Sequence, residues 1–138
     1  MTRLILILAI LGMSDPVAPA RATENWTVVD LGQARREAHC MDAATAAMER
    51  LRIVYGVERI ERANWTVYAY AINGGPHDAV ITCTYGANLG TRGTLLIHSD
   101  ARQVMARGFA RTVLQSFRAT ADILERQWLE EAKRRNGF

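Results

Sequence analysis

The chain has only two cysteines, Cys40 and Cys83, among its 138 residues. They do not form a C-x-x-C pair, and His39, the neighbour of Cys40, would point about 100° away from it on a helix, so a reactive catalytic thiol is not indicated. Phosphate-binding motifs are also lacking. The glycine-rich stretch 86–93 matches neither G-x-x-x-x-G-K-[ST] nor a G-x-G-x-x-G that opens a helix. We therefore expect no cofactor and no catalytic cysteine.

The sequence also lacks an apolar run long enough to cross a membrane, which takes about 20 residues. Its most apolar stretch, residues 4–11, follows a basic residue and is followed by small residues that include two A-x-A sites. A basic start, a short apolar core and such a site are typical of a secretory signal peptide. We predict a signal peptide over residues 1–22, cleaved after Ala22 or, as the close alternative, after Ala20. The mature chain, residues 23–138, would then be a single small domain, periplasmic or secreted, with no transmembrane segment.

Export would place both cysteines in an oxidising compartment, where two cysteines far apart in sequence usually pair. Cys40 lies on the apolar face of a helical pattern, and Cys83 lies in an alternating, strand-like run. We predict a Cys40–Cys83 disulfide that joins a helix to the middle of a sheet. In the chain-entropy model a loop of this size stabilises the fold by about 4 kcal/mol.

The apolar periodicity predicts an α+β fold in the order β-α-β-β-β-α. We expect a two-layer sandwich, with an antiparallel sheet of three to four strands and two helices on one face. The predicted strands are 25–29, 64–72, 79–85 and 94–98, and the first helix is 33–54, with Asp30 as its N-cap. Residues 57–62 are left open as a loop or a ragged strand entry. The last helix would be about 33 residues long, roughly 50 Å, so it either breaks near Thr120 or projects beyond the sheet.

Alternation in the third predicted run places Tyr68, Tyr70 and Ile72 on the sheet face opposite the helices. This is more exposed apolar surface than an isolated domain usually carries. A second apolar site is expected around Trp128, where the last helix would project. Both are candidate interaction surfaces for an unknown protein partner or for self-association.

Positive charge is concentrated in the last segment, where residues 101–138 hold eight basic and four acidic groups. Arg107, Arg111 and Arg118 share the polar face of the last helix and are candidates for contact with anionic lipid. Acidic residues interrupt this face, so a solvated helix surface is the simpler interpretation. Nucleic acid is not expected as a partner of an exported protein.

The three histidines do not form a recognisable catalytic or metal-binding group. Neighbours on a helix point about 100° apart, so the side chains of His39, Cys40 and Met41 cannot converge on one metal ion. No carboxylate or nucleophile forms a catalytic pattern with His77 or His98. We expect no metal and no catalytic residue.

These observations favour a small exported binding or interaction protein of the bacterial cell envelope, non-enzymatic and stabilised by one disulfide. One alternative is a peripheral envelope protein that contacts anionic lipid through its basic last helix. The other is a small enzyme with a site near His77 and His98.

Overall fold

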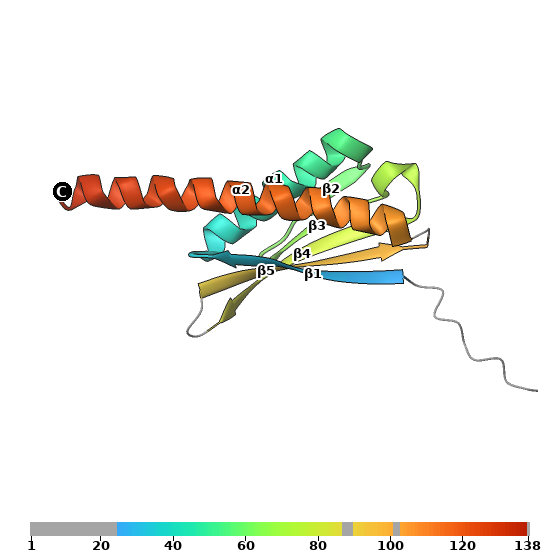
Figure 1. Ribbon diagram of the computed structural model, residues 1–138, viewed down its shortest axis with the longest axis horizontal. Coiled ribbons are helices and arrows are strands. Elements are labelled where there is room, and N and C mark those ends of the chain that lie inside the picture. The colour runs from blue at the N-terminus through green and yellow to red at the C-terminus, as the bar shows by residue number, and fades with distance from the viewer. Residues whose placement is uncertain (1–24, 87–89, 101–102, 138) are drawn as a thin grey trace, which may run out of the picture.

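The computed structural model describes residues 25–86, 90–100 and 103–137. An antiparallel sheet of five strands is covered on one face by two helices (Figure 1). The predicted α+β class and two-layer arrangement are confirmed, with five strands instead of three to four. The predicted signal peptide lies outside the described residues. In chain order the elements are β1 (Asn25–Ala34), α1 (Glu37–Tyr55), β2 (Arg59–Arg62), β3 (Thr66–Tyr70), the short 3-10 turn η1 (Ile72–Gly74), β4 (His77–Gly86), β5 (Gly90–Ser99) and α2 (Gln103–Arg135).

The strand that the sequence left undecided is β2, at one edge of the sheet. The strand order is β1-β5-β4-β3-β2, and every neighbouring pair is antiparallel. Arg62 ties β2 to α1, because its guanidinium donates to the Asp42 carboxylate (2.9 Å) and to the Thr45 hydroxyl (3.2 Å). Charged residues are common on edge strands, where they prevent unwanted pairing. The charged sequence of this segment is therefore compatible with a strand.

At the opposite edge, β1 is longer than predicted. Asp30 does not cap a helix, which corrects the prediction from the sequence. Instead it lies inside β1, where its carboxylate accepts the Gly32 N–H (3.0 Å). The pairing register shifts between Asp30 and Gly32, whose φ of +103° suits glycine, and β1 continues as far as Ala34. The strand continues because pairing with β5 provides hydrogen bonds for backbone N–H and C=O groups, which a helix would otherwise have provided.

The core lies between the sheet and the two helices. Its largest buried side chains include Phe109 and Phe117 of α2, Met48 and Leu51 of α1, and Ile81 of β4. The helix α2 is continuous from residue 103 to residue 135, without a break at the position that the sequence left open. Its C-terminal end extends beyond the sheet (Figure 1).

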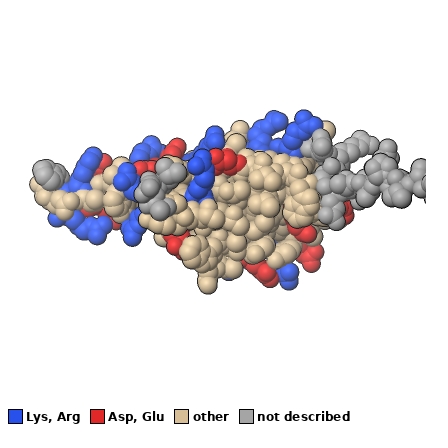
Figure 2. Space-filling view, turned by 90° about the horizontal axis from the view of Figure 1, so that it is seen from below, with Lys and Arg blue, Asp and Glu red and all other residues tan. Residues whose placement is uncertain are grey.

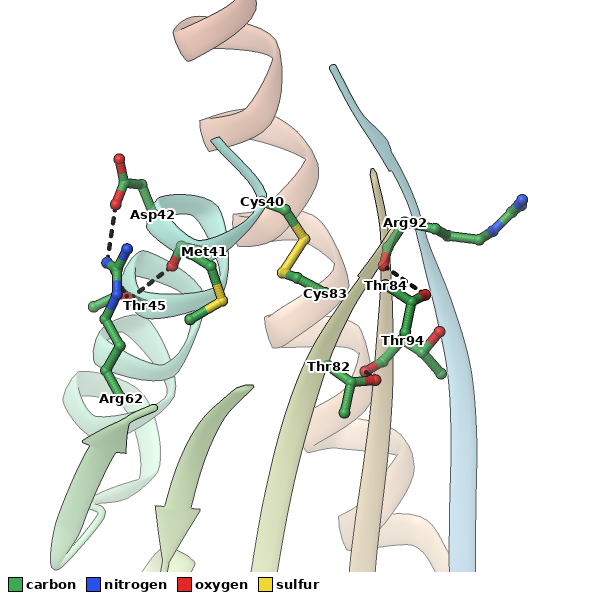
Figure 3. The surroundings of a disulfide bond; sticks show 10 residues. All are labelled: Cys40, Met41, Asp42, Thr45, Arg62, Thr82, Cys83, Thr84, Arg92 and Thr94. Carbon is green, nitrogen blue, oxygen red and sulfur yellow. Dashed lines mark hydrogen bonds and ion pairs between the residues drawn. A yellow bond between two sulfur atoms is a disulfide. The ribbon is translucent and has the colours of Figure 1, made fainter. Parts of the chain in front are cut away.

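The predicted disulfide is present and joins the two layers. Cys40, in the first turn of α1, is bonded to Cys83 of β4, and both residues are fully buried (Figure 3). Their Cα atoms are 6.0 Å apart across a sequence separation of 43 residues. Within the described residues, no helix is both long enough and apolar enough to cross a membrane.

Candidate interaction surface

Both helices pack on the same side of the sheet, so alternate side chains of the strands form a second face that no described element covers. Strand register aligns Val28, Leu96, Val80 and Tyr68 across four neighbouring strands. Figure 2 looks onto this face and shows a largely uncharged centre with charged side chains toward its margins. We call it the outer face and define it by Trp26, Val28, Tyr68, Tyr70, Val80, Leu96 and His98.

Two stacked tyrosines form one side of the outer face. The rings of Tyr68 and Tyr70 are nearly parallel, with centroids 6.0 Å apart, and the Arg59 guanidinium lies 4.5 Å from the Tyr70 centroid. The Tyr70 hydroxyl donates to the Glu61 carboxylate (3.3 Å). Desolvation by neighbouring groups, with the negative charge of Glu61, raises the pKa of Tyr70, so its phenol stays neutral. These contacts orient the two rings and leave their apolar surface partly accessible.

Between the tyrosines and β1 the outer face contains a shallow hollow of about 310 Å³. On the β1 side, Trp26 packs against His98 with ring centroids 4.8 Å apart. Asp78 lies in the hollow, where its carboxylate accepts the Ala71 N–H (3.0 Å). An apolar centre with a polar rim is typical of places where a protein interface anchors large side chains. The hollow is lined by Trp26, Tyr68, Tyr70, Asp78, Ala79, Val80, Leu96 and His98.

Ile72 is not part of this surface, which corrects the prediction from the sequence. It is fully buried and lies in η1, after the end of β3. The chain leaves the strand at Ala71, which has a positive φ of 51°. The alternation of side chains stops there, and Ile72 enters the core instead of following Tyr68 and Tyr70.

Sequence reasoning missed the half of the outer face that comes from β1 and β5. Trp26 and Val28 are among the more exposed large apolar side chains, at 56% and 65%. Each alternates with inward-facing residues, a signal that the sequence does contain. The pairing of β1 with β5, which sets Trp26 beside His98, is not visible in either strand alone.

The other predicted surface residues lie elsewhere. Arg118 donates to the Leu31 carbonyl (3.2 Å), and so fastens α2 to β1. Arg107 and Arg111 are exposed, and neither side chain has a hydrogen bond or an ion pair to a described residue. Trp128 is half-buried beneath the Arg35 guanidinium, 5.3 Å from its ring centroid. The predicted residues therefore belong to three separate regions.

Comparison with protein-family models, with curated proteins and with solved structures finds no match to this chain. The functional interpretation therefore depends on the surfaces themselves.

The structure does not bring the two candidate catalytic histidines together. His77 points into the protein, where it is buried, its Nδ1 is 2.8 Å from the Ser99 hydroxyl and its ring packs near Phe109. His98 lies on the outer face, with its Nε2 3.4 Å from an Asp100 carboxylate oxygen. Their side chains occupy opposite faces of the sheet and cannot act on one substrate. Among the described residues, no group of three or more histidines, cysteines and acidic residues is placed to hold a metal ion.

Proposed function

We propose that this protein is an exported, non-enzymatic interaction module of the bacterial cell envelope that binds a protein partner through its outer face. The observation that carries the proposal is the aromatic hollow on a sheet face that no described element covers. Removing apolar surface from water is favourable by about 25 cal/mol per Å². Burial of the exposed apolar surface of Trp26 and Val28 against a partner would therefore stabilise the complex. The tyrosines, which already contact Arg59 and Glu61, would lose little side-chain entropy on binding.

Export is supported by two independent features. A buried disulfide persists most readily in an oxidising compartment such as the periplasm or the extracellular space. The first 22 residues have the composition of a signal peptide. We infer cleavage after Ala22, with Ala20 as the alternative.

Native mass spectrometry of the C-terminally tagged protein, purified from the cell envelope, tests both parts of this proposal. We expect a mature chain that begins at Thr23, lighter by about 2 Da because of the disulfide, in complex with a second protein. Tyr70→Asp places a charge in the hollow and should abolish the complex, whereas Tyr70→Phe keeps the stacked ring and should preserve it. A complex that survives Tyr70→Asp, or a folded wild-type chain that is always monomeric, would contradict binding through the outer face.

A further inference from the structure

The two edges of the sheet differ in how far they are protected. The edge strand β2 has four residues, and Arg59, Glu61 and Arg62 on it all take part in ion pairs. The other edge strand, β1, has ten residues, and its first five carry no charge. Long uncharged edges are the usual sites at which an extended segment of another protein adds to a sheet. Of the two edges, only β1 begins with an uncharged stretch.

The second half of the β1 edge is occupied from within the chain. The bulge between Asp30 and Gly32 interrupts the regular ladder, and the Arg118 side chain donates to the Leu31 carbonyl. Before the bulge, residues 27–29 have β5 as their neighbouring strand. The edge available to another chain is therefore the short stretch that leads up to Asp30.

A row of arginines on α2 lies along this stretch. Arg107, Arg111 and Arg118 share one flank of the helix, since they are spaced by four and seven residues. Arg118 reaches β1, whereas α1 packs against the opposite flank, where Tyr55 contacts Phe109. The helix runs along β1 (Figure 1) and starts near the beginning of that strand.

Helix and strand dimensions place the row along the strand. With about 1.5 Å per helix residue and about 3.3 Å per strand residue, Arg111 lies about three strand positions before Leu31. By the same estimate, Arg107 lies about two positions further back, near Trp26. Both are exposed without an ion pair to a described residue. The nearby acidic groups are already engaged, Asp30 by Arg92 and Glu125 by Arg35.

We propose that the partner presents an extended acidic segment that adds to β1 as a further antiparallel or parallel strand. Side chains of a strand alternate between the two faces of a sheet. Acidic side chains of the segment would face Arg107 and Arg111, and the alternate, apolar ones would extend the outer face beside Trp26 and Val28. This inference deepens the proposed function and rests on it. A second copy of this chain fits the edge less well, because pairing two β1 strands would bring two arginine rows together.

Binding of synthetic peptides to the ¹⁵N-labelled oxidised protein tests this inference. The probe is a nine-residue peptide that alternates glutamate and valine, and its matched control alternates lysine and valine. With the glutamate peptide we expect amide shift changes centred on residues 27–29, and an affinity that falls as salt is raised. Arg107→Glu combined with Arg111→Glu should weaken binding by about tenfold or more. Arg50→Glu, an exposed arginine on α1, should leave binding unchanged.

Three results would overturn the inference: no shift changes along β1, equal binding of the lysine peptide, or shift changes confined to Tyr68, Tyr70 and Val80. Vesicles containing anionic phospholipid provide a further comparison. Vesicle binding that depends on Arg107 and Arg111, without peptide binding, would assign the arginine row to lipid and would also overturn the inference. Loss of the envelope complex in Tyr70→Asp would still support the outer face, so failure of the inference and failure of the proposed function are distinguishable.

Discussion

Gly93 of β5 shows how one residue without a side chain allows α2 to approach the sheet. The Phe117 ring lies directly over it, and a Cβ atom added at Gly93 would be 2.6 Å from the Phe117 Cζ. Real Cβ atoms do not tolerate such a contact, so either the ring or the strand would have to move. Close packing of α2 on β5 therefore depends on this pair.

We predict that Gly93→Ala destabilises the protein by about 1–3 kcal/mol, because overpacking a filled core displaces side chains. The measurement is urea unfolding of the oxidised protein. Phe117→Leu should reduce the cost of Gly93→Ala when the two are combined, since the smaller side chain leaves space for the new methyl group. Additive effects of the two substitutions would contradict direct contact between them.

Asp30 of β1 makes a bidentate ion pair with Arg92 of β5. The Arg92 Nε donates to Oδ1 (2.9 Å) and its Nη2 donates to Oδ2 (2.6 Å). The hydrogen bond from Arg92, followed by that from the Gly32 N–H, lowers the pKa of Asp30 from 3.8 to about 2. A lowered folded-state pKa contributes stability that is present above the unfolded pKa and is lost as pH falls through the folded one.

For this reason the free energy of unfolding of Asp30→Asn should decrease less steeply than that of the wild type as the pH falls from 3.8 to about 2. Urea unfolding at a series of pH values measures this. Asp122→Asn serves as the control, since the Asp122 carboxylate has no ion pair with a described residue, and it should keep the wild-type slope. An unchanged slope in Asp30→Asn would show that this ion pair does not hold the carboxylate in its charged form.

The neighbouring sequence alone led to a wrong prediction for Asp30. An aspartate before a helical pattern resembles an N-cap, and the sequence predicted one. The decisive contacts come from Arg92, which is 62 residues away, and from the pairing of β1 with β5. Such contacts cannot be read from a short stretch of sequence.

At the scale of elements, the disulfide is the covalent connection between the helical layer and the sheet. It joins the start of α1 to the middle of β4 and closes a loop that contains β2 and β3. Its main effect in the chain-entropy model is to restrict the unfolded chain.

Replacing both cysteines, as Cys40→Ala with Cys83→Ala, should reduce the free energy of unfolding by about 2–4 kcal/mol. Chemical denaturation with and without reductant measures the effect. Reductant should destabilise the wild type by a similar amount and leave the double variant unchanged. A wild type whose stability does not respond to reductant, with both thiols shown to be released, would contradict a stabilising disulfide.

Element types were predictable because apolar spacing differs between helices and strands. The spacing correctly indicated both helices, the β3–β4 hairpin and the inward position of Cys40 and Cys83. It did not establish β2, whose charged residues do not alternate as a half-buried strand does. The alternating pattern also predicted a strand that continued to Ile72. The strand ends earlier, because the chain turns at Ala71, and this turn leaves no clear signal in the sequence.

At the scale of the whole molecule, the candidate surface depends on which strands are neighbours. The outer face combines β1, near the start of the described chain, with β5 and β3. Tyr68 and Tyr70 could be predicted because they lie within one strand. The sequence could not predict that Trp26 and Leu96 lie on the same surface, because the pairing and register of distant strands were unknown. The composition of the surface was therefore partly predictable, but its extent was not.

The central claim is that the outer face contacts a protein partner in the cell envelope. A photo-crosslinking amino acid at Val80, in the hollow, tests it most directly, with the same amino acid at Arg50 of α1 as the control. We predict a discrete protein adduct from position 80, none from position 50, and loss of the adduct when Tyr70→Asp is added. Equal adducts from both positions, or none from position 80 in folded and exported protein, would contradict the claim.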